Sequence, residues 1–107
     1  QIMNLFCLPE KLPQTEWLEV LEKRAGVRIE RIISTGQSSP SGFWYDQTED
    51  EWVALLQGTA TLEWADGSLQ ELAPGDQLLI PAGKKHRVAM TSAEPPCIWL
   101  ALFLPAE

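Results

Sequence analysis

Residues 75–86 constrain the fold of this chain more than any other stretch. A turn-forming segment at 74–76, a short apolar run at 77–80 and a second turn at 81–83 come immediately before His86. This histidine is the only one in the chain, and it begins a further run of alternating residues. We therefore expect a short buried strand, followed by a turn that holds one imidazole in a fixed place.

The spacing of this stretch resembles the second conserved motif of the cupin family. Gly75, Pro81, Gly83 and His86 fill its fixed positions, and Met90 stands where the family has an asparagine. The turn glycines and the proline suit the tight connections between strands of a small barrel.

An earlier segment resembles the first cupin motif, in which two histidines, a glutamate and a glycine follow at fixed spacing. Glu51 and Gly58 occupy the glutamate and second glycine positions. Tyr45 and Gln47 stand at the two histidine positions, and Ser39 stands at the opening glycine. Half of the family's metal-ligand set is therefore replaced in this chain.

The resemblance implies an all-β fold, a small antiparallel β-barrel or jelly roll. We expect one cupin-like domain over residues 1–107, with an amino-terminal arm and one short helix in residues 1–26 and the barrel in residues 27–104. Members of the family include metal-dependent dioxygenases, sugar isomerases, storage proteins and ligand-sensing domains, so the fold alone does not decide the function.

The short helix is expected just before residue 26. Thr15 is a suitable N-cap, and Trp17, Leu18 and Leu21 form an apolar stripe with helical spacing. Gly26 follows two basic residues, as at the end of many helices. We expect this helix to cover one end of the barrel.

Residues 27–34 alternate as a strand, with Arg31 on the same face as the aliphatic residues at 27, 29 and 33. Arg31 is a candidate anchor for an anionic ligand inside the barrel. The alternative is a strand end or bulge that lets its guanidinium reach solvent.

Two strands have no polar face. Residues 51–56 are apolar on both sides after Glu51, and residues 97–103 are apolar throughout. A small barrel has one interior, so the outer face needs a cover, and we expect a homodimer that uses outward-facing residues such as Trp52. In residues 86–91, alternation places His86, Val88 and Met90 on one face, toward the interior.

The charge and the cysteines exclude some classes of protein. The formal net charge is -7, whereas a nucleic-acid-binding surface needs a basic face. No apolar run approaches the roughly 18 residues of a membrane span, and the amino terminus has no signal-peptide pattern. Cys7 and Cys97 lie in apolar runs, so we expect buried thiols, no disulfide and a cytoplasmic location.

The resemblance also suggests a divalent metal such as iron, manganese, nickel or zinc. Gln47, Glu51 and His86 are the candidate ligands in this chain. Only one imidazole is available, and an amide is a neutral and poor ligand, so we expect a weak or absent metal site.

Without a metal, the same residues offer other roles. Glu51 and His86 could form an acid–base pair, and the Tyr45 phenol could donate to a developing oxyanion. Alternatively, Glu51 and His86 only hydrogen-bond each other as buried polar groups must. Tyr45, Gln47, Met90 and Arg31 are the candidate ligand-binding residues.

Lys84, Lys85 and Arg87 flank the histidine and could attract an anion to the barrel mouth, or could simply form a solvated loop. The sequence thus favours a cupin barrel that binds a small molecule. The alternative is a small enzyme, of the isomerase, epimerase or metal-dependent oxygenase type, that uses Glu51 and His86.

Overall fold

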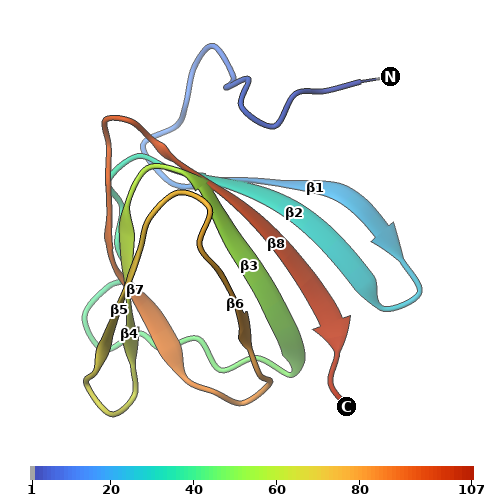
Figure 1. The fold of residues 1–107 in the computed structure, drawn as a ribbon, viewed down its shortest axis with the longest axis vertical. Coiled ribbons are helices and arrows are strands. Elements are labelled where there is room, and N and C mark those ends of the chain that lie inside the picture. Colours follow the sequence, from blue (N-terminus) through green and yellow to red (C-terminus); the bar gives the residue numbers. More distant parts are fainter. Residues whose placement is uncertain (1) are drawn as a thin grey trace.

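The computed structural model describes residues 2–107 and is built entirely from strands, turns and loops (Figure 1). The strands are β1 (Trp17–Arg24), β2 (Val27–Ser34), β3 (Glu49–Gln57), β4 (Ala60–Trp64), β5 (Leu69–Leu72), β6 (Gln77–Ile80), β7 (His86–Thr91) and β8 (Cys97–Pro105). The expected all-β class is therefore confirmed. Residues 2–107 contain no helix, and so none that is long and apolar enough to cross a membrane.

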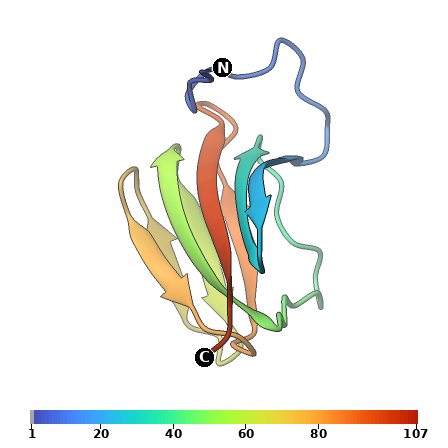
Figure 2. The ribbon, with the colours of Figure 1, turned by 90° about the vertical axis from the view of Figure 1, so that its right-hand side faces the viewer.

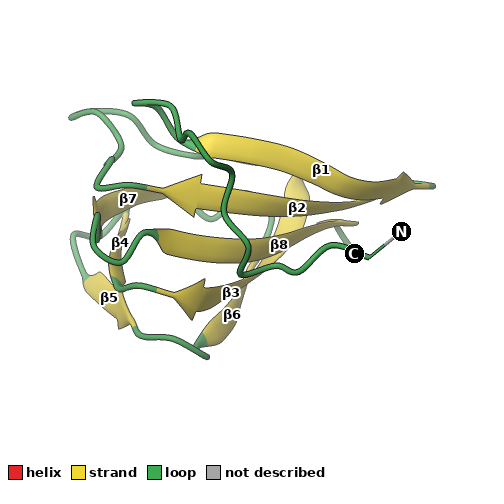
Figure 3. Ribbon diagram, turned by 90° about the horizontal axis from the view of Figure 1, so that it is seen from above, coloured by secondary structure: helices red, strands yellow, loops and turns green. Residues whose placement is uncertain are grey.

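The strands form two antiparallel sheets that face each other (Figure 2). The larger sheet has the order β1-β2-β8-β3-β6, and the smaller has the order β5-β4-β7. Seen from above, the smaller sheet covers one end of the larger, which continues beyond it through β1 and β2 (Figure 3). This is the two-sheet arrangement of a jelly roll, as expected.

The core lies between the two sheets. Its residues come from the inward faces of five strands, because successive strand residues point to opposite sides. The buried cluster consists of Val53, Leu55, Ala60, Leu62, Leu72, Ile80, Cys97, Trp99, Ala101 and Phe103.

The expected amino-terminal helix is wrong. Residues 17–24 form β1 instead, which pairs with β2 along most of its length. A two-residue turn joins the strands, and both Ala25 (φ 36°) and Gly26 (φ 83°) adopt the left-handed conformation that tight hairpins require. A helix this short is marginal without tertiary packing, whereas β1 completes the backbone hydrogen bonding of β2.

The segment before β1 is an irregular arm that lies against the outer face of the larger sheet. Residues 2–16 contain no strand, so an arm precedes β1. The two cysteines are both free, as expected, but only Cys97 is buried and Cys7 is exposed.

The hairpin between β4 and β5 follows its turn signal. Gly67 has a φ of 87°, and the Asp66 carboxylate accepts a hydrogen bond from the Ser68 amide at 2.9 Å. The Asp-Gly pair therefore sets the register of this edge of the smaller sheet.

Candidate functional site

A cavity of about 250 Å³ lies between the two sheets. Apolar side chains form somewhat more than half of its wall, and seven polar or ionisable side chains enter it from strands and from the segments before them. The lining residues are Glu16, Leu18, Arg28, Glu30, Ile32, Tyr45, Gln47, Glu51, Val53, Leu62, Ile80, His86, Val88, Trp99 and Phe103. An apolar cavity with a small set of convergent polar groups is the usual form of a small-molecule site.

Four residues predicted from the sequence meet in this cavity. Glu51 enters from β3, and His86 enters from the first position of β7. Tyr45 and Gln47 come from the segment before β3, where the Tyr45 amide donates to the His86 carbonyl at 2.7 Å. The predicted interior position of His86 is confirmed, and its side chain is only 5% exposed.

The imidazole of His86 is oriented by the backbone. Its Nδ1 lies 2.9 Å from the Lys84 carbonyl oxygen, which can only accept, so Nδ1 carries the hydrogen in the neutral ring. Nε2 is then a free acceptor that faces the cavity, 3.8 Å from Glu51 Oε1. This separation is too long for a hydrogen bond, so the two groups do not simply satisfy each other.

Burial changes the acid–base properties of both groups. It raises the pKa of Glu51 to about 7, assisted by the nearby Glu30 carboxylate and opposed by a hydrogen bond from Gln47. Burial also lowers the pKa of His86, against the effect of the Lys84 carbonyl. Near neutral pH, Glu51 therefore gains and loses a proton while His86 stays uncharged.

The raised pKa of Glu51 gives a testable pH dependence of stability. Because its ordinary pKa is 4.5, the folded chain binds more protons at Glu51 than the unfolded chain up to about pH 7. Stability from this group is therefore lost as the pH rises through that window. As the pH rises from 4.5 to above 7, we expect the unfolding free energy of the wild type to fall by up to roughly 3 kcal/mol relative to that of Glu51→Gln.

Denaturant titrations of both chains at a series of pH values measure this difference. The lowered pKa of His86 acts in the opposite direction below its ordinary value of 6.5, and the comparison of the two chains removes the part of its contribution that does not depend on Glu51. If the difference in unfolding free energy between the two chains does not change with pH, Glu51 titrates like an exposed carboxylate.

Tyr45 forms one wall of the site beside the histidine. Its ring stacks on the imidazole of His86 with centroids 5.4 Å apart and planes inclined by 23°. Phe43 packs edge-on against the Tyr45 ring, with the two ring centroids 4.8 Å apart. Burial, with the charges of Glu16 and Glu51, raises the pKa of Tyr45, so its phenol remains a hydrogen-bond donor.

The charged part of the cavity wall was not predicted from the sequence. Arg28 and Glu30 point inward from β2 together with Ile32, and Glu16 enters from just before β1. Alternation showed that residues 28, 30 and 32 share a face. The two charges two residues apart were an available signal, but alternation does not say which face of a strand is the interior.

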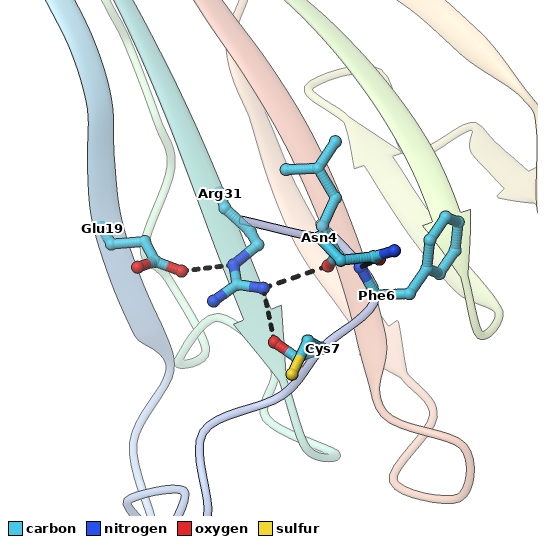
Figure 4. A network of polar contacts seen from close by, with 6 residues as sticks. Asn4, Phe6, Cys7, Glu19 and Arg31 are labelled. Carbon is cyan, nitrogen blue, oxygen red and sulfur yellow. Dashed lines mark hydrogen bonds and ion pairs between the residues drawn. The ribbon is translucent and has the colours of Figure 1, made fainter. Parts of the chain in front are cut away.

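The predicted interior position of Arg31 is therefore wrong, because it lies on the opposite face of β2. Its guanidinium is buried beneath the arm, where it donates to the carbonyls of Leu5 at 3.0 Å and Cys7 at 2.9 Å (Figure 4). It also pairs with Glu19 of β1. Arg31 reaches neither the cavity nor solvent, and it holds the arm in place.

Met90 is also displaced from its predicted position. The pairing of β4 with β7 shifts between Thr61 and Leu62, so Thr61 opposes Met90 whereas Leu62 opposes Val88. This bulge places one extra residue, Ala89, in β7 and reverses the alternation after it. Val88 lines the cavity as predicted, but Met90 is 44% exposed and does not.

The basic residues near His86 do not line the cavity. Arg87 donates to Glu63 at 2.7 Å and to the Ser39 carbonyl at 2.8 Å. The Lys84 ammonium lies 4.2 Å from the centre of the Trp64 ring. Both side chains therefore contact protein groups beside the cavity, and neither is part of its lining.

The fold and the cavity define a class: small two-sheet β-barrels with a ligand-sized interior. Within that class the sequence is specific, because the profile of the cupin domain matches residues 31–103. The chain therefore belongs to the cupin family, as its two motifs indicated.

Two solved structures illustrate the likeness. A candidate mannose-6-phosphate isomerase of Ralstonia eutropha JMP134 is 44% identical, with 99% of each chain covered and a TM-score of 0.91. A cupin superfamily protein of Desulfitobacterium hafniense DCB-2 is 22% identical, with 91% of this chain and 84% of that chain covered and a TM-score of 0.73. The second likeness concerns the fold alone.

A shorter match connects the chain to a regulator. The RCS-specific HTH-type transcriptional activator RclR of Escherichia coli K12 is 40% identical over 47 residues, which are 44% of this chain. The match spans 16% of that protein's length, so the chain corresponds to a small part of it.

The cavity does not fit the divalent metal that the family often carries. Residues 2–107 hold no group of three or more histidine, cysteine, aspartate or glutamate side chains arranged around a metal position. Of the donors that do meet, Glu51 and His86 are standard ligands, whereas Gln47 is a neutral amide. Tyr45 replaces an imidazole with a phenol that stays protonated.

Proposed function

We propose that this chain is a small-molecule-binding cupin with a weak or absent metal site, which acts as an accessory or sensing module. The observation that carries the proposal is the cavity of about 250 Å³, into which the Nε2 of His86 and the carboxyl of Glu51 point without satisfying each other. Both groups are therefore available to hydrogen-bond a ligand that is bound in the cavity.

The sensing role draws further support from the match to a transcriptional activator. The 47 matched residues belong to a protein named as an RCS-specific HTH-type transcriptional activator. Ligand-binding domains in such proteins work by passing occupancy to another domain or partner. In this proposal, the present chain provides the binding step.

A second candidate function is isomerisation or epimerisation of a small carbonyl compound or sugar. It is favoured by the neutral His86 and the readily protonated Glu51, 3.8 Å apart in one cavity. One group would remove a proton from the carbon next to the carbonyl, and the other would return a proton, so none is consumed overall. The Tyr45 phenol would donate to the oxyanion that develops between these two steps.

The name of the Ralstonia relative makes mannose 6-phosphate the first substrate to assay in this second case. The oxygenase alternative needs a redox-active metal, and the donor set does not fit one. The enzyme alternative is therefore restricted to proton-transfer chemistry.

Metal content and the His86→Ala variant distinguish these roles. In protein purified without an affinity tag, we expect far less than one iron, manganese, nickel or zinc per chain by elemental analysis. A near-stoichiometric metal that is lost in both Glu51→Ala and His86→Ala would contradict the proposal.

If the chain is a binding module, the same variants keep their fold and lose ligand affinity. A thermal-shift screen with metabolites measures that affinity. An enzyme instead loses turnover of mannose 6-phosphate or a related sugar. If His86→Ala lowers only the melting temperature, with no ligand or activity found for the wild type, the cavity has a structural role alone.

The homodimer is part of the same proposal. On the outer face of the larger sheet, Leu79 of β6 is 53% exposed beside the partly exposed Trp52 of β3. We expect light scattering to give twice the 12.0 kDa mass of one chain. Leu79→Glu should shift the protein to monomer, because it places a charge in an apolar contact.

A matched control is available on the other sheet. Leu69 of β5 is 63% exposed, and Leu69→Glu should leave the mass unchanged. A wild-type monomer at high concentration would refute the dimer.

A cytoplasmic location also belongs to the proposal. It is supported by the free thiols of Cys7 and Cys97, because free thiols persist in reducing compartments.

A further inference from the structure

The cavity wall contains more acidic than basic side chains. Three carboxyl side chains line it, from Glu16, Glu30 and Glu51, whereas Arg28 is its one guanidinium among the described residues.

Arg28 is already engaged by the protein. Its Nε donates to Glu30 at 2.6 Å, and another of its nitrogens lies 3.4 Å from Glu49. The guanidinium also lies 4.3 Å from the centre of the Phe103 ring. Its charge is thus neutralised by two carboxylates, and an anionic ligand would meet a site with no uncommitted cation.

Two acceptor atoms lie close together at the other side of the cavity. His86 Nε2 and Glu51 Oε1 belong to side chains that are only 5% and 11% exposed, and they are 3.8 Å apart. Two acceptors at this separation can both lie about 2.8 to 3.0 Å from one nitrogen placed between them. An ammonium group carries three donors and can satisfy both acceptors at once.

The rest of the cavity is suited to a short apolar body. Val53, Leu62, Ile80 and Val88 line it together with the ring of Trp99. Its volume of about 250 Å³ corresponds to roughly eight water molecules at liquid density. The ligand is therefore small.

We propose that the cavity binds a small organic cation, a primary amine with a short aliphatic body, whose ammonium lies between Glu51 and His86. This inference rests on the proposed binding function of the cavity and specifies the chemical class of its ligand. The same wall opposes phosphate esters and carboxylates, because their charge would face carboxyl groups and a neutralised arginine.

The test uses three probes that share one shape and are positively charged, neutral and negatively charged. Isobutylamine, isobutanol and isobutyrate are titrated into the wild-type protein at about pH 8, where the amine stays protonated. Chemical shifts of backbone amides measure the affinity and locate the site. Inorganic phosphate and a set of neutral sugars are titrated in parallel.

We expect the amine to bind at least about tenfold more tightly than the alcohol, with shifts around Glu51 and His86, and the two anions not to bind there. Equal or tighter binding of the alcohol, a sugar or an anion in the cavity would overturn the cation and leave the binding function standing. If no probe of any kind shifts cavity residues, both the inference and the binding function fail.

Two variants locate the ammonium. Glu51→Gln keeps the size of the side chain and removes its charge, so amine affinity should fall about tenfold while alcohol affinity stays the same. Glu71→Gln, on the exposed part of β5, is the matched control and should change neither. Undiminished amine affinity in Glu51→Gln, with the fold intact by circular dichroism, would overturn the assigned position.

Discussion

Replacing Gly58 by alanine is expected to lower the free energy of unfolding by roughly 3 kcal/mol, the combined cost of a left-handed backbone and a steric clash. Gly58 has a φ of 86°, which L side chains rarely adopt. A Cβ at this position would lie 2.7 Å from Ser92 Oγ and 2.9 Å from both Cα and Sγ of Cys97. One of these neighbours is backbone, so the contact cannot be relieved by a side-chain rotation.

The surroundings of Gly58 are held in place by hydrogen bonds. Ser92 Oγ accepts from the Thr59 amide at 3.1 Å, and Cys97 Sγ donates to the Thr59 carbonyl at 3.1 Å. Cys97 itself is fully buried. Movement away from a new methyl group would break contacts at the start of β8, which is the central strand of the larger sheet.

Gly67→Ala is the matched control for this prediction. Gly67 has a φ of 87°, and a Cβ there would meet no atom within 4 Å. Its substitution adds the backbone cost alone, about 1 kcal/mol. Denaturant titration measures both variants, and equal losses of stability would show that the close approach at Gly58 contributes nothing.

Much of the barrel could be predicted because its signals are local. The strand at 27–34, the Asp66–Gly67 hairpin and the turn before His86 each follow from residues that are close together in the chain. The meeting of Glu51 with His86 could also be predicted, since the two motifs place them on strands that a small barrel brings together.

The wrong predictions concern features that depend on tertiary contacts and not on local sequence. The segment 17–24 has residues that suit either a helix or an edge strand, and pairing with β2 decides between them. Alternation placed Arg31 on the wrong side, because it cannot distinguish an interior from a face covered by an arm. Met90 was misplaced because a bulge at Ala89 has no signal in this sequence.

The face of β2 that lines the cavity determines the charge of the site. An interior Arg31 would have indicated an anionic ligand. Its replacement in the cavity wall by Arg28, which is paired with Glu30, leaves an excess of carboxyl groups. A shift of one residue in the choice of face therefore reverses the class of ligand that the cavity favours.

Replacing Arg31 by leucine is the second substitution with a large expected effect. Its side chain is only 4% exposed, and its loss removes the partner of Glu19 and of the Leu5 and Cys7 carbonyls (Figure 4). Removing one member of a buried pair typically costs about 3 to 5 kcal/mol. Because Glu19 is 30% exposed and can regain water, we expect about 3 kcal/mol.

The first part of the arm should also be released, because the buried Arg31 of β2 donates to its Leu5 and Cys7 carbonyls. Limited proteolysis should cleave the chain within residues 2–12 at least several times faster in Arg31→Leu than in the wild type. Hydrogen exchange should show β3 and β8 still protected under native conditions, since their pairing does not involve the arm.

Two controls separate the arm from the ion pair. Glu19→Gln removes the charge partner and leaves both bonds from Arg31 to the arm, so it should cost about 1 kcal/mol and leave the arm resistant to protease. Arg24→Leu removes an arginine whose side chain is 80% exposed and should be near neutral. If Arg31→Leu behaves like Arg24→Leu, the arm is held by its apolar contacts and the buried guanidinium adds nothing to its attachment.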